Sequence, residues 1–349
     1  MYDIITIGEI LAEILAEKPD QEFSRAGVLL GPYPSGAPAI AIDQAARMGA
    51  KTAILAKIGD DDFGLLNKTR LKESGVDVSH IIKTRDNSTG TAFVTYFSNG
   101  ERKFIFHFTH AACGELCPED VDEDLIKNTK IIHINGCSIT GSPSLGEAIM
   151  KALRLAQKHQ VKISFDPNIR PELLRGQVMD YIREITMAAD FLLTGKAELP
   201  LLFDDPIPGS QGQNKEGHLI EKLLKQKDRI IVVKDGSRGT SFYPGRASFD
   251  QGSAVQNSSP QDSGMQGPFK IDPYPAEAVD ATGAGDCFNG TFLALLCQGR
   301  DLRTAALYAN AAGAMAVTKR GPMEGNSGPE ELERIIRENP AIVVKPLSA

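Results

Sequence analysis

The sequence predicts an α/β protein built on a doubly wound, mainly parallel sheet. Along most of the 349 residues, β-rich segments alternate with helical ones, which is the pattern of successive βαβ units. A run of small residues, 283–285, directly precedes an apolar helix late in the chain. Two aromatic-rich segments flank Asn99-Gly100 and predict a hairpin that lies beside the main sheet.

The first β-rich segment, 2–7, ends at Gly8, and a second short segment covers 10–15. Residues 32–36 contain Pro, Ser and Gly and predict a turn region, and Pro38 suits the first turn of the helix that follows. We expect the other strands at 52–56, 91–97, 102–108, 130–134, 161–165, 190–194 and 229–233. We expect helices at 39–48, 63–73, 144–158, 174–188, 215–226, 284–299, 301–318 and 329–337.

These elements predict a single domain over residues 1–349, with a small β lid formed from about 10–35 and 88–112. Residues 245–270 are rich in Ser, Gln, Gly and Asp and predict a flexible surface insertion. In a doubly wound sheet, ligands bind at the carboxyl ends of the strands. We therefore expect the catalytic and binding residues to lie at the carboxyl ends of the predicted strands.

Composition narrows the class of function. Hydrophobic residues make up 42% and charged residues 24%, which fits a soluble globular enzyme and excludes a wholly disordered chain. The net charge of −7 argues against a broad nucleic-acid-binding surface. No apolar run approaches the about 18 residues of a membrane helix, and the start lacks a secretory signal. The five cysteines, an odd number, favour reduced thiols in a cytoplasmic protein.

The most informative segment is 279–288. Gly283, Ala284 and Gly285 stand at the start of a helix, where free backbone N–H groups and the positive end of the helix dipole form an anion site. Glycines let a phosphate approach the backbone closely. Asp286, in the first turn, is either a helix-dipole carboxylate or a general base beside the bound phosphate.

Other nucleotide-binding motifs are absent from the sequence. It contains no G-x-x-x-x-G-K-[ST], which argues against a P-loop enzyme. Phe288 stands where a G-x-G-x-x-G motif would need glycine, and the segment lies late in the chain. Both points argue against a Rossmann oxidoreductase.

Several segments together resemble the ribokinase-type (PfkB) carbohydrate kinases, in the right order and over nearly the whole chain. Residues 280–286 are similar to the family's D-T-x-G-A-G-D signature, and 59–64 to its G-D-D-x-F-G turn. Residues 166–170 resemble the D-x-N-x-R segment of its fructokinase and 2-keto-3-deoxygluconate kinase branch. Gly8-Glu9 and the glycine motif at 36–49 complete the resemblance.

The resemblance implies a ribokinase-like fold and transfer of the γ-phosphoryl of MgATP to a sugar hydroxyl. Asp286 would deprotonate that hydroxyl, and Gly283, Ala284 and Gly285 would form the anion hole. Mg²⁺ would arrive with ATP, and Glu198 would orient it through water, although Gly195 replaces the Asn of the family's N-x-x-E motif. A requirement for a monovalent cation such as K⁺ is left open.

The resemblance also divides the remaining site between two ligands. The nucleotide side would comprise Lys234, Gly236, Gly239, Thr282, Gly283, Gly285 and Asn310. The substrate side would comprise Glu13, Gly36, Arg102, Phe106, Asn168, Arg170 and Asp286. Purely structural roles remain alternatives to ligand binding for some of these residues. These are a β-turn after Lys234, a buried hydrogen-bonded Asn310, an ion pair for Arg170 and a core role for most aromatic residues of the lid. Ile40 stands where the family usually has an Asn that binds sugar.

A ketohexose is the favoured acceptor, and 2-keto-3-deoxygluconate is the alternative. Relatives that bind sugar acids carry Tyr-x-Arg near the end of the lid, where this chain has 106–108, Phe-His-Phe, although Arg102 or Arg170 could substitute. Departures such as Ile40 and Gly195 also allow a catalytically weak regulator that binds sugar or nucleotide. We expect a homodimer through the lid, and no nucleic-acid or membrane partner.

A zinc site is a rival interpretation of one segment. The spacing of His107, His110, Cys113 and Cys117 is not that of a usual zinc finger. A hydrogen bond from a histidine to sugar, or a surface histidine, is the simpler interpretation.

Overall fold

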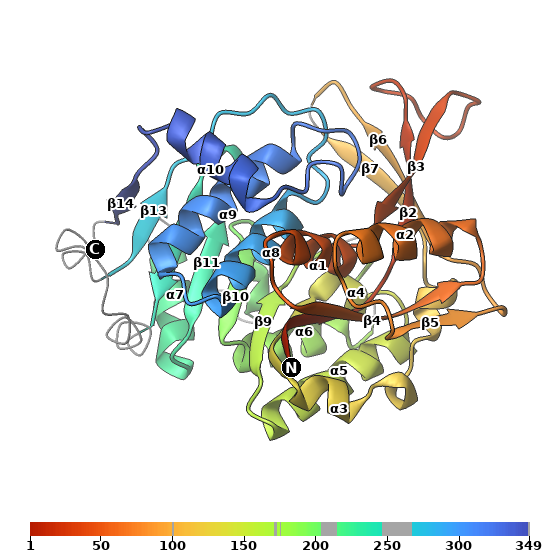
Figure 1. The fold of residues 1–349 in the computed structure, drawn as a ribbon, viewed down its shortest axis with the longest axis horizontal. Helices are drawn as coiled ribbons and strands as arrows, with labels where there is room; N and C mark the ends of the chain where they lie inside the picture. Colours follow the sequence, from red (N-terminus) through yellow and green to blue (C-terminus); the bar gives the residue numbers. More distant parts are fainter. Residues whose placement is uncertain (100, 171–172, 175, 204–214, 246–266, 348–349) are drawn as a thin grey trace.

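The computed structural model describes residues 1–349 except 100, 171–172, 175, 204–214, 246–266 and 348–349. Its main feature is a ten-stranded sheet in which β11 to β5 are all parallel, whereas β12, β13 and β14 join antiparallel at one edge (Figure 1). In sheet order the strands are β14 (Val344–Pro346), β13 (Phe269–Ile271), β12 (Thr240–Pro244), β11 (Ile230–Lys234), β10 (Phe191–Gly195), β9 (Lys162–Asp166), β8 (Thr129–Asn135), β1 (Tyr2–Ile7), β4 (Thr52–Gly59) and β5 (Ile81–Thr84).

Two hydrophobic cores lie on opposite faces of this sheet because successive side chains of a strand alternate between faces. In β1, Ile4 belongs to one core and Ile5 to the other. The core with Ile4 is covered by α1 (Ala37–Arg47), α2 (Asp62–Glu73), α8 (Ala284–Cys297), α9 (Leu302–Ala316) and α10 (Pro329–Glu338). The core with Ile5 is covered by α3 (Glu123–Lys127), α4 (Gly136–Ile139), α5 (Pro143–Lys158), α6 (Val178–Ala188) and α7 (Lys215–Gln226).

A separate four-stranded sheet, called the small sheet below, projects beside the main sheet (Figure 1). Its order is β3 (Leu29–Ser35), β2 (Leu11–Ala16), β6 (Gly90–Tyr96) and β7 (Arg102–His107). The β6–β7 pair is the hairpin expected around Asn99, and β2 pairs parallel to β6. The small sheet thus joins a segment that directly follows β1 to a hairpin about eighty residues later in the chain.

The alternating elements lie close to where the sequence places them, and the fold class is the predicted one. The turn region expected at 32–36 is wrong, because Leu29–Ser35 forms β3. Proline is compatible with β3 because this strand lies at the edge of the small sheet. Strands β5, β12, β13 and β14 were not predicted.

The segment expected as an insertion at 245–270 largely lies outside the described residues, but its end forms the start of β13. Described helices are all too short or too polar to cross a lipid bilayer. All five cysteines are free.

Candidate active site

A pocket lies where the order of the parallel strands reverses, between the start of α8 and the small sheet. The carboxyl ends of β1, β8 and β9 meet there, which is the usual place for a ligand in a doubly wound fold. All the residues that the sequence assigns to the substrate side line this pocket. Its lining comprises Glu9, Leu11, Glu13, Ser35, Gly36, Ala37, Ile40, Ala92, Arg102, Phe104, Phe106, Phe108, Cys137, Asn168, Arg170, Thr282, Gly283 and Asp286.

The start of α8 is built for an anion. Gly283 caps the helix with a φ of +82°, and a Cβ there would lie 2.5 Å from the carbonyl oxygen of Pro322, so only glycine fits without strain. The N–H groups of the first turn have no partners within the helix. A Cβ on Gly285 would lie 3.5 Å from Nζ of Lys234, so an ammonium group stands beside the helix N-terminus. Backbone dipoles and a full positive charge therefore act on the same point.

Asp286 lies in the first turn of α8, buried at the bottom of the pocket. Asn135, at the end of β8, donates to Oδ1 of Asp286 at 3.4 Å. Burial raises the pKa of Asp286 well above its ordinary value, and the charge of Asp166 adds to this, whereas Lys234 and Arg170 oppose it. A carboxylate with a raised pKa is a stronger base, which suits removal of a proton from a hydroxyl group.

Lys234 is held in place by a network that the sequence did not reveal. Asp166, the last residue of β9, accepts from Nζ of Lys234 at 2.7 Å and from Nδ2 of Asn289 at 2.6 Å. Lys234 also donates to Oδ1 of Asn289 at 3.2 Å. Asn289 lies three residues after Asp286 on α8, so helical spacing was the available signal for it. Asp166 opens the D-x-N-x-R segment, which was the signal for its place at a strand end.

Glu198 folds back onto the end of β10. Its Oε1 accepts from the backbone N–H of Ile169 at 2.8 Å, and its Oε2 accepts from that of Gly195 at 2.7 Å. A Cβ at position 195 would lie 2.9 Å from Oε2, so a larger residue there would require the Glu198 side chain to shift. Burial raises the pKa of Glu198, and the nearby charge of Asp166 adds to this rise. Asp166 ends β9 and Glu198 follows the neighbouring β10, so two carboxylates lie at adjacent strand ends, and carboxylate oxygens are ligands that Mg²⁺ takes.

A magnesium ion would nevertheless need ligands from elsewhere. The described residues contain no group of three or more His, Cys, Asp or Glu placed to hold a metal, at the pocket or around His107 and Cys113. Mg²⁺ keeps several waters and binds through one or two carboxylates together with phosphates. Glu198 and Asp166 therefore fit an Mg²⁺ that arrives bound to a nucleotide, rather than a resident metal.

Two further carboxylates face the pocket from the end of β1 and from β2. Glu9 accepts from the backbone N–H of Ala37 at 3.3 Å and from the hydroxyl of Ser138. Glu13 accepts from the hydroxyl of Ser35 at 3.0 Å, and its buried Oε1 has no partner. Burial raises the pKa of Glu9 to about 7 and that of Glu13 to about 8. A ligand hydroxyl group would satisfy the free oxygen of Glu13.

Two arginines reach the pocket from different elements. The guanidinium carbon of Arg102, in β7, lies 5.4 Å from the ring centre of Phe104, and that of Arg170, after β9, lies 5.3 Å from it. Phe106 stacks on Phe104 with ring centres 5.1 Å apart. Nε of Arg170 is buried and has no partner. The guanidinium groups of Arg102 and Arg170 therefore both lie against the ring of Phe104, and Nε of Arg170 is free to donate a hydrogen bond to a ligand.

Other residues assigned to the nucleotide side lie further from this pocket. Gly236 and Gly239, both with positive φ, belong to the turn between β11 and β12, at the same sheet edge as Lys234. Asn310, on α9, accepts from the Thr240 hydroxyl at 3.0 Å and donates to the carbonyl oxygen of Ala306 at 2.9 Å. Its amide is thus already engaged within the protein. Roles for these residues in nucleotide binding stay predictions.

A helix N-terminus beside a lysine ammonium group, with a buried carboxylate in its first turn, is the arrangement expected of an enzyme that transfers a phosphoryl group. The chain belongs to the pfkB family of carbohydrate kinases, whose family model matches residues 1–328. It is an ATP-dependent sugar kinase.

Relatives support this membership over the whole length. "Probable fructokinase-5" of Arabidopsis thaliana is 28% identical over 345 residues, which is 96% of this chain and 97% of that one. The 5-dehydro-2-deoxygluconokinase of Bacillus licheniformis is 27% identical over 338 residues, covering 96% of each chain. A candidate ribokinase II from E. coli, solved in complex with ATP and Mg²⁺, is 39% identical with a TM-score of 0.83, over 97% of this chain and 100% of that one.

Proposed function

We propose that Asp286 is the general base and that the start of α8 receives the γ-phosphoryl group. Asp286 takes the proton of the acceptor hydroxyl, whose oxygen attacks the γ-phosphorus. The bond from that phosphorus to the bridging oxygen of ADP breaks, and the phosphorylated sugar and ADP leave. The observation that carries this assignment is that Asp286, the N–H groups around Gly283 and the Lys234 ammonium meet at one point.

The residues of this chain act by position and charge. Lys234 and the first turn of α8 stabilise negative charge on the phosphoryl oxygens, and Asp166 and Asn289 keep Lys234 in place. Mg²⁺, bound with ATP, supplies further neutralisation of phosphate charge, and Glu198 and Asp166 are the residues that would orient it through water. Support for Mg²⁺ comes from the E. coli relative solved with ATP and Mg²⁺.

We propose that the acceptor is a sugar acid. The supporting observation is that Arg102 and Arg170 both line the pocket and share the Phe104 ring, while Nε of Arg170 is buried without a partner. Guanidinium groups bind carboxylates with paired hydrogen bonds. The sequence favoured a ketohexose because Tyr-x-Arg is missing, but arginines from two other elements supply the charge. A ketohexose remains the second candidate, because a relative is called a fructokinase.

The acceptor proposal is tested by ADP release from MgATP with 2-keto-3-deoxygluconate, 5-dehydro-2-deoxygluconate, D-fructose and D-ribose. We expect a sugar acid to give the highest kcat/KM. Arg170→Leu should raise KM for that acid by about tenfold or more, since a charge-assisted hydrogen bond is lost. Exposed Arg154, on α5, provides the control Arg154→Leu. Highest kcat/KM for fructose, with the same KM in Arg170→Leu, would contradict the proposal and favour the ketohexose.

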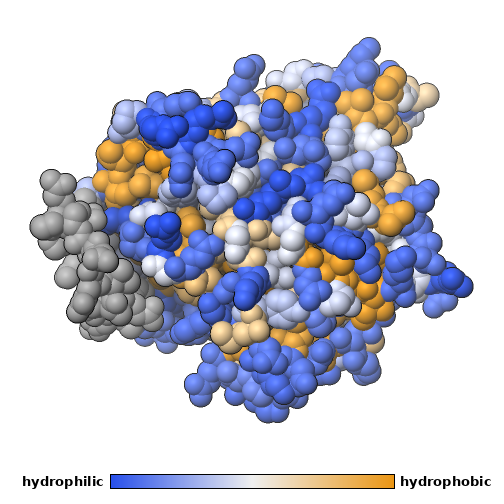
Figure 2. Space-filling model, viewed as in Figure 1, coloured by the Kyte–Doolittle hydropathy of each residue, from blue (hydrophilic) through white to orange (hydrophobic). Residues whose placement is uncertain are grey.

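We further propose a cytoplasmic homodimer that associates through the small sheet. Apolar side chains are exposed at both edges of this sheet: Leu29 in β3 at 44% and Ile105 in β7 at 45%. Figure 2 shows hydrophobic residues gathered at this corner of the molecule. The free cysteines fit a reducing compartment. A monovalent cation such as K⁺ stays an expectation from the family resemblance alone.

A further inference from the structure

The carboxylate of Asp280 connects three parts of the molecule. Asp280 is buried just before α8, and its Oδ1 accepts from the backbone N–H of Thr282 at 2.9 Å. The same oxygen accepts from the hydroxyl of Tyr96, the last residue of β6 in the small sheet. Its Oδ2 accepts from the backbone N–H of Gly321, in the loop after α9, at 3.0 Å. One side chain therefore joins the small sheet, the anion site and this loop.

The contact of Tyr96 extends into the anion site itself. The Tyr96 hydroxyl lies 2.9 Å from Oγ1 of Thr282, the residue before Gly283. Burial raises the pKa of Tyr96, and the charge of Asp280 adds to this rise, so the hydroxyl keeps its proton near neutral pH and donates to the carboxylate. Tyr96 is thus bonded to two residues, Asp280 and Thr282, of the backbone segment that leads into α8.

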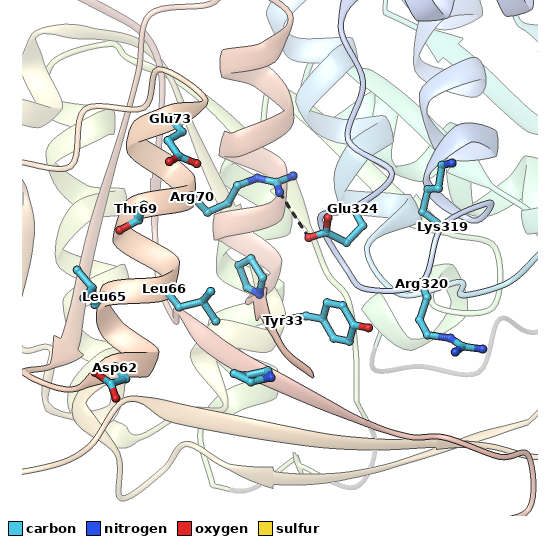
Figure 3. A pocket seen from close by; sticks show the side chains of 12 residues that line it. Tyr33, Asp62, Leu65, Leu66, Thr69, Arg70, Glu73, Lys319, Arg320 and Glu324 are labelled. Atoms are coloured by element: carbon cyan, nitrogen blue, oxygen red, sulfur yellow. Dashed lines mark hydrogen bonds and ion pairs between the residues drawn. The ribbon is translucent and has the colours of Figure 1, made fainter. Parts of the chain in front are cut away.

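A second tyrosine of the small sheet, Tyr33, contacts the loop that carries Gly321. Gly321 has a φ of +102°, and a Cβ there would lie 2.7 Å from the ring of Tyr33, in β3. Figure 3 shows Tyr33 between α2, which carries Arg70, and the loop that carries Arg320 and Glu324. The groove in this view has a volume of about 850 Å³, so the small sheet has open space beside it on that side.

The small volume of the pocket makes the contact of Tyr96 with Asp280 and Thr282 important for the reaction. The space between the small sheet and Asp286 is only about 60 Å³, whereas pockets that hold small molecules have about 300–1,000 Å³. A sugar therefore needs more room than this arrangement gives, and movement of the small sheet away from Asp286 would supply it. Lifting the small sheet carries the Tyr96 hydroxyl away from Asp280 and Thr282.

We propose that Tyr96 is a positioning residue that couples closure of the small sheet to the alignment of the anion site, through Asp280. With the small sheet down, Tyr96 fixes the turn before Gly283. With the small sheet lifted, that turn loses one of its restraints. Phosphoryl transfer is then aligned only when the pocket is closed to water, which limits loss of ATP to hydrolysis. The proposal rests on the kinase activity of this family and not on the identity of the acceptor.

Coupling between two sites is reciprocal, so nucleotide binding at the anion site must also restrain the small sheet. The test is hydrogen exchange of the whole protein with and without MgAMP-PNP. In the wild type we expect protection both at 283–289 and at 90–96. In Tyr96→Phe we expect protection at 283–289 to remain and protection at 90–96 to be lost. Equal protection of 90–96 in the variant and the wild type would overturn the proposal.

The matched control is Tyr2→Phe. The Tyr2 hydroxyl donates to Oδ2 of Asp77 at 2.6 Å, so this change removes the same kind of bond far from the pocket. The control should behave as the wild type in hydrogen exchange. If it also loses protection at 90–96, the effect of Tyr96→Phe is a general loss of stability and the proposal is wrong.

A double-mutant cycle tests whether Tyr96 acts through Asp280. We expect Tyr96→Phe to weaken MgAMP-PNP binding by about tenfold, as for loss of one hydrogen bond to a charged group. Asp280→Asn should weaken it too, and the double variant should bind no more weakly than the weaker single variant. If the losses of MgAMP-PNP affinity in the two single variants multiply in the double variant, Tyr96 acts on the anion site by a route other than Asp280, and the proposal is wrong. Neither measurement uses an acceptor, so failure of the sugar-acid proposal leaves both results interpretable.

Discussion

Burial gives the carboxylates of this pocket an unusual affinity for protons, and Glu13 is the clearest case. Its pKa is raised from 4.5 to about 8 by burial, and the charge of Asp280 adds to this rise. Below pH 4.5 the folded and unfolded states both carry the proton. Between pH 4.5 and 8 the folded state binds more protons than the unfolded state. The stability of the fold therefore falls as pH rises through this window.

Glu13→Gln removes the buried charge and keeps the shape of the side chain. We expect this variant to melt at least about 2 °C above the wild type at pH 8.5 and close to the wild type at pH 5. Thermal unfolding at the two pH values measures this. Glu17→Gln, an exposed glutamate just beyond β2, is the control and should show no such difference between the two pH values. An equal shift of Glu13→Gln at both pH values would contradict the account of Glu13.

Single residues were predictable where a motif surrounds them. Asp286, Asn168 and Arg170 belong to recognisable segments, and all three line the pocket. Tyr96 and Asn289 were missed because their importance comes from partners far away in sequence, Asp280 and Asp166. These contacts form only when α8 and the segment before it pack against β9 and the small sheet, and one sequence does not show how distant elements pack.

At the scale of elements, the proposed association of two chains depends on the edge strands of the small sheet. Its edge strands β3 and β7 carry exposed apolar side chains, and an exposed apolar edge is a site for association with another chain. If the small sheet is the dimer interface, a charge there should separate the subunits.

Ile105→Asp should convert the proposed dimer to a monomer in light scattering coupled to size exclusion. A buried, unpaired charge in an interface is costly, which is the physical reason for this expectation. Met187, exposed at 42% on α6, gives the control Met187→Asp, which should leave the mass unchanged. A wild-type protein that elutes as a monomer would contradict the proposal directly.

Elements with a strong period were predictable, and short edge strands were not. Helix α5 is amphipathic over sixteen residues and begins at the Ser142 cap, so its pattern is plain in the sequence. Strands β13 and β14 have three residues each and pair only at the antiparallel edge. Three residues hold too little alternation to distinguish a strand from a loop.

At the scale of the whole molecule, topology brings the site together. The strand order places β1 between β8 and β4, so the chain reverses its direction of winding at β1. Glu9, Asn135 and Asp166 follow or end neighbouring strands at this point, and α8 brings Asp286 to them from 120 residues beyond Asp166. The alternating pattern predicted such a crevice, but not which strand ends would meet there.

The central claim is that Asp286 is the base of a phosphoryl transfer. The most direct measurement is ADP release with the preferred acceptor by Asp286→Asn, alongside Asp62→Asn, which changes an exposed first-turn aspartate of another helix. We predict that Asp286→Asn lowers kcat by about 10²-fold or more while MgATP still binds, and that Asp62→Asn has no effect. Retention of kcat within about threefold in Asp286→Asn would contradict the account and leave Asp286 a helix-dipole carboxylate.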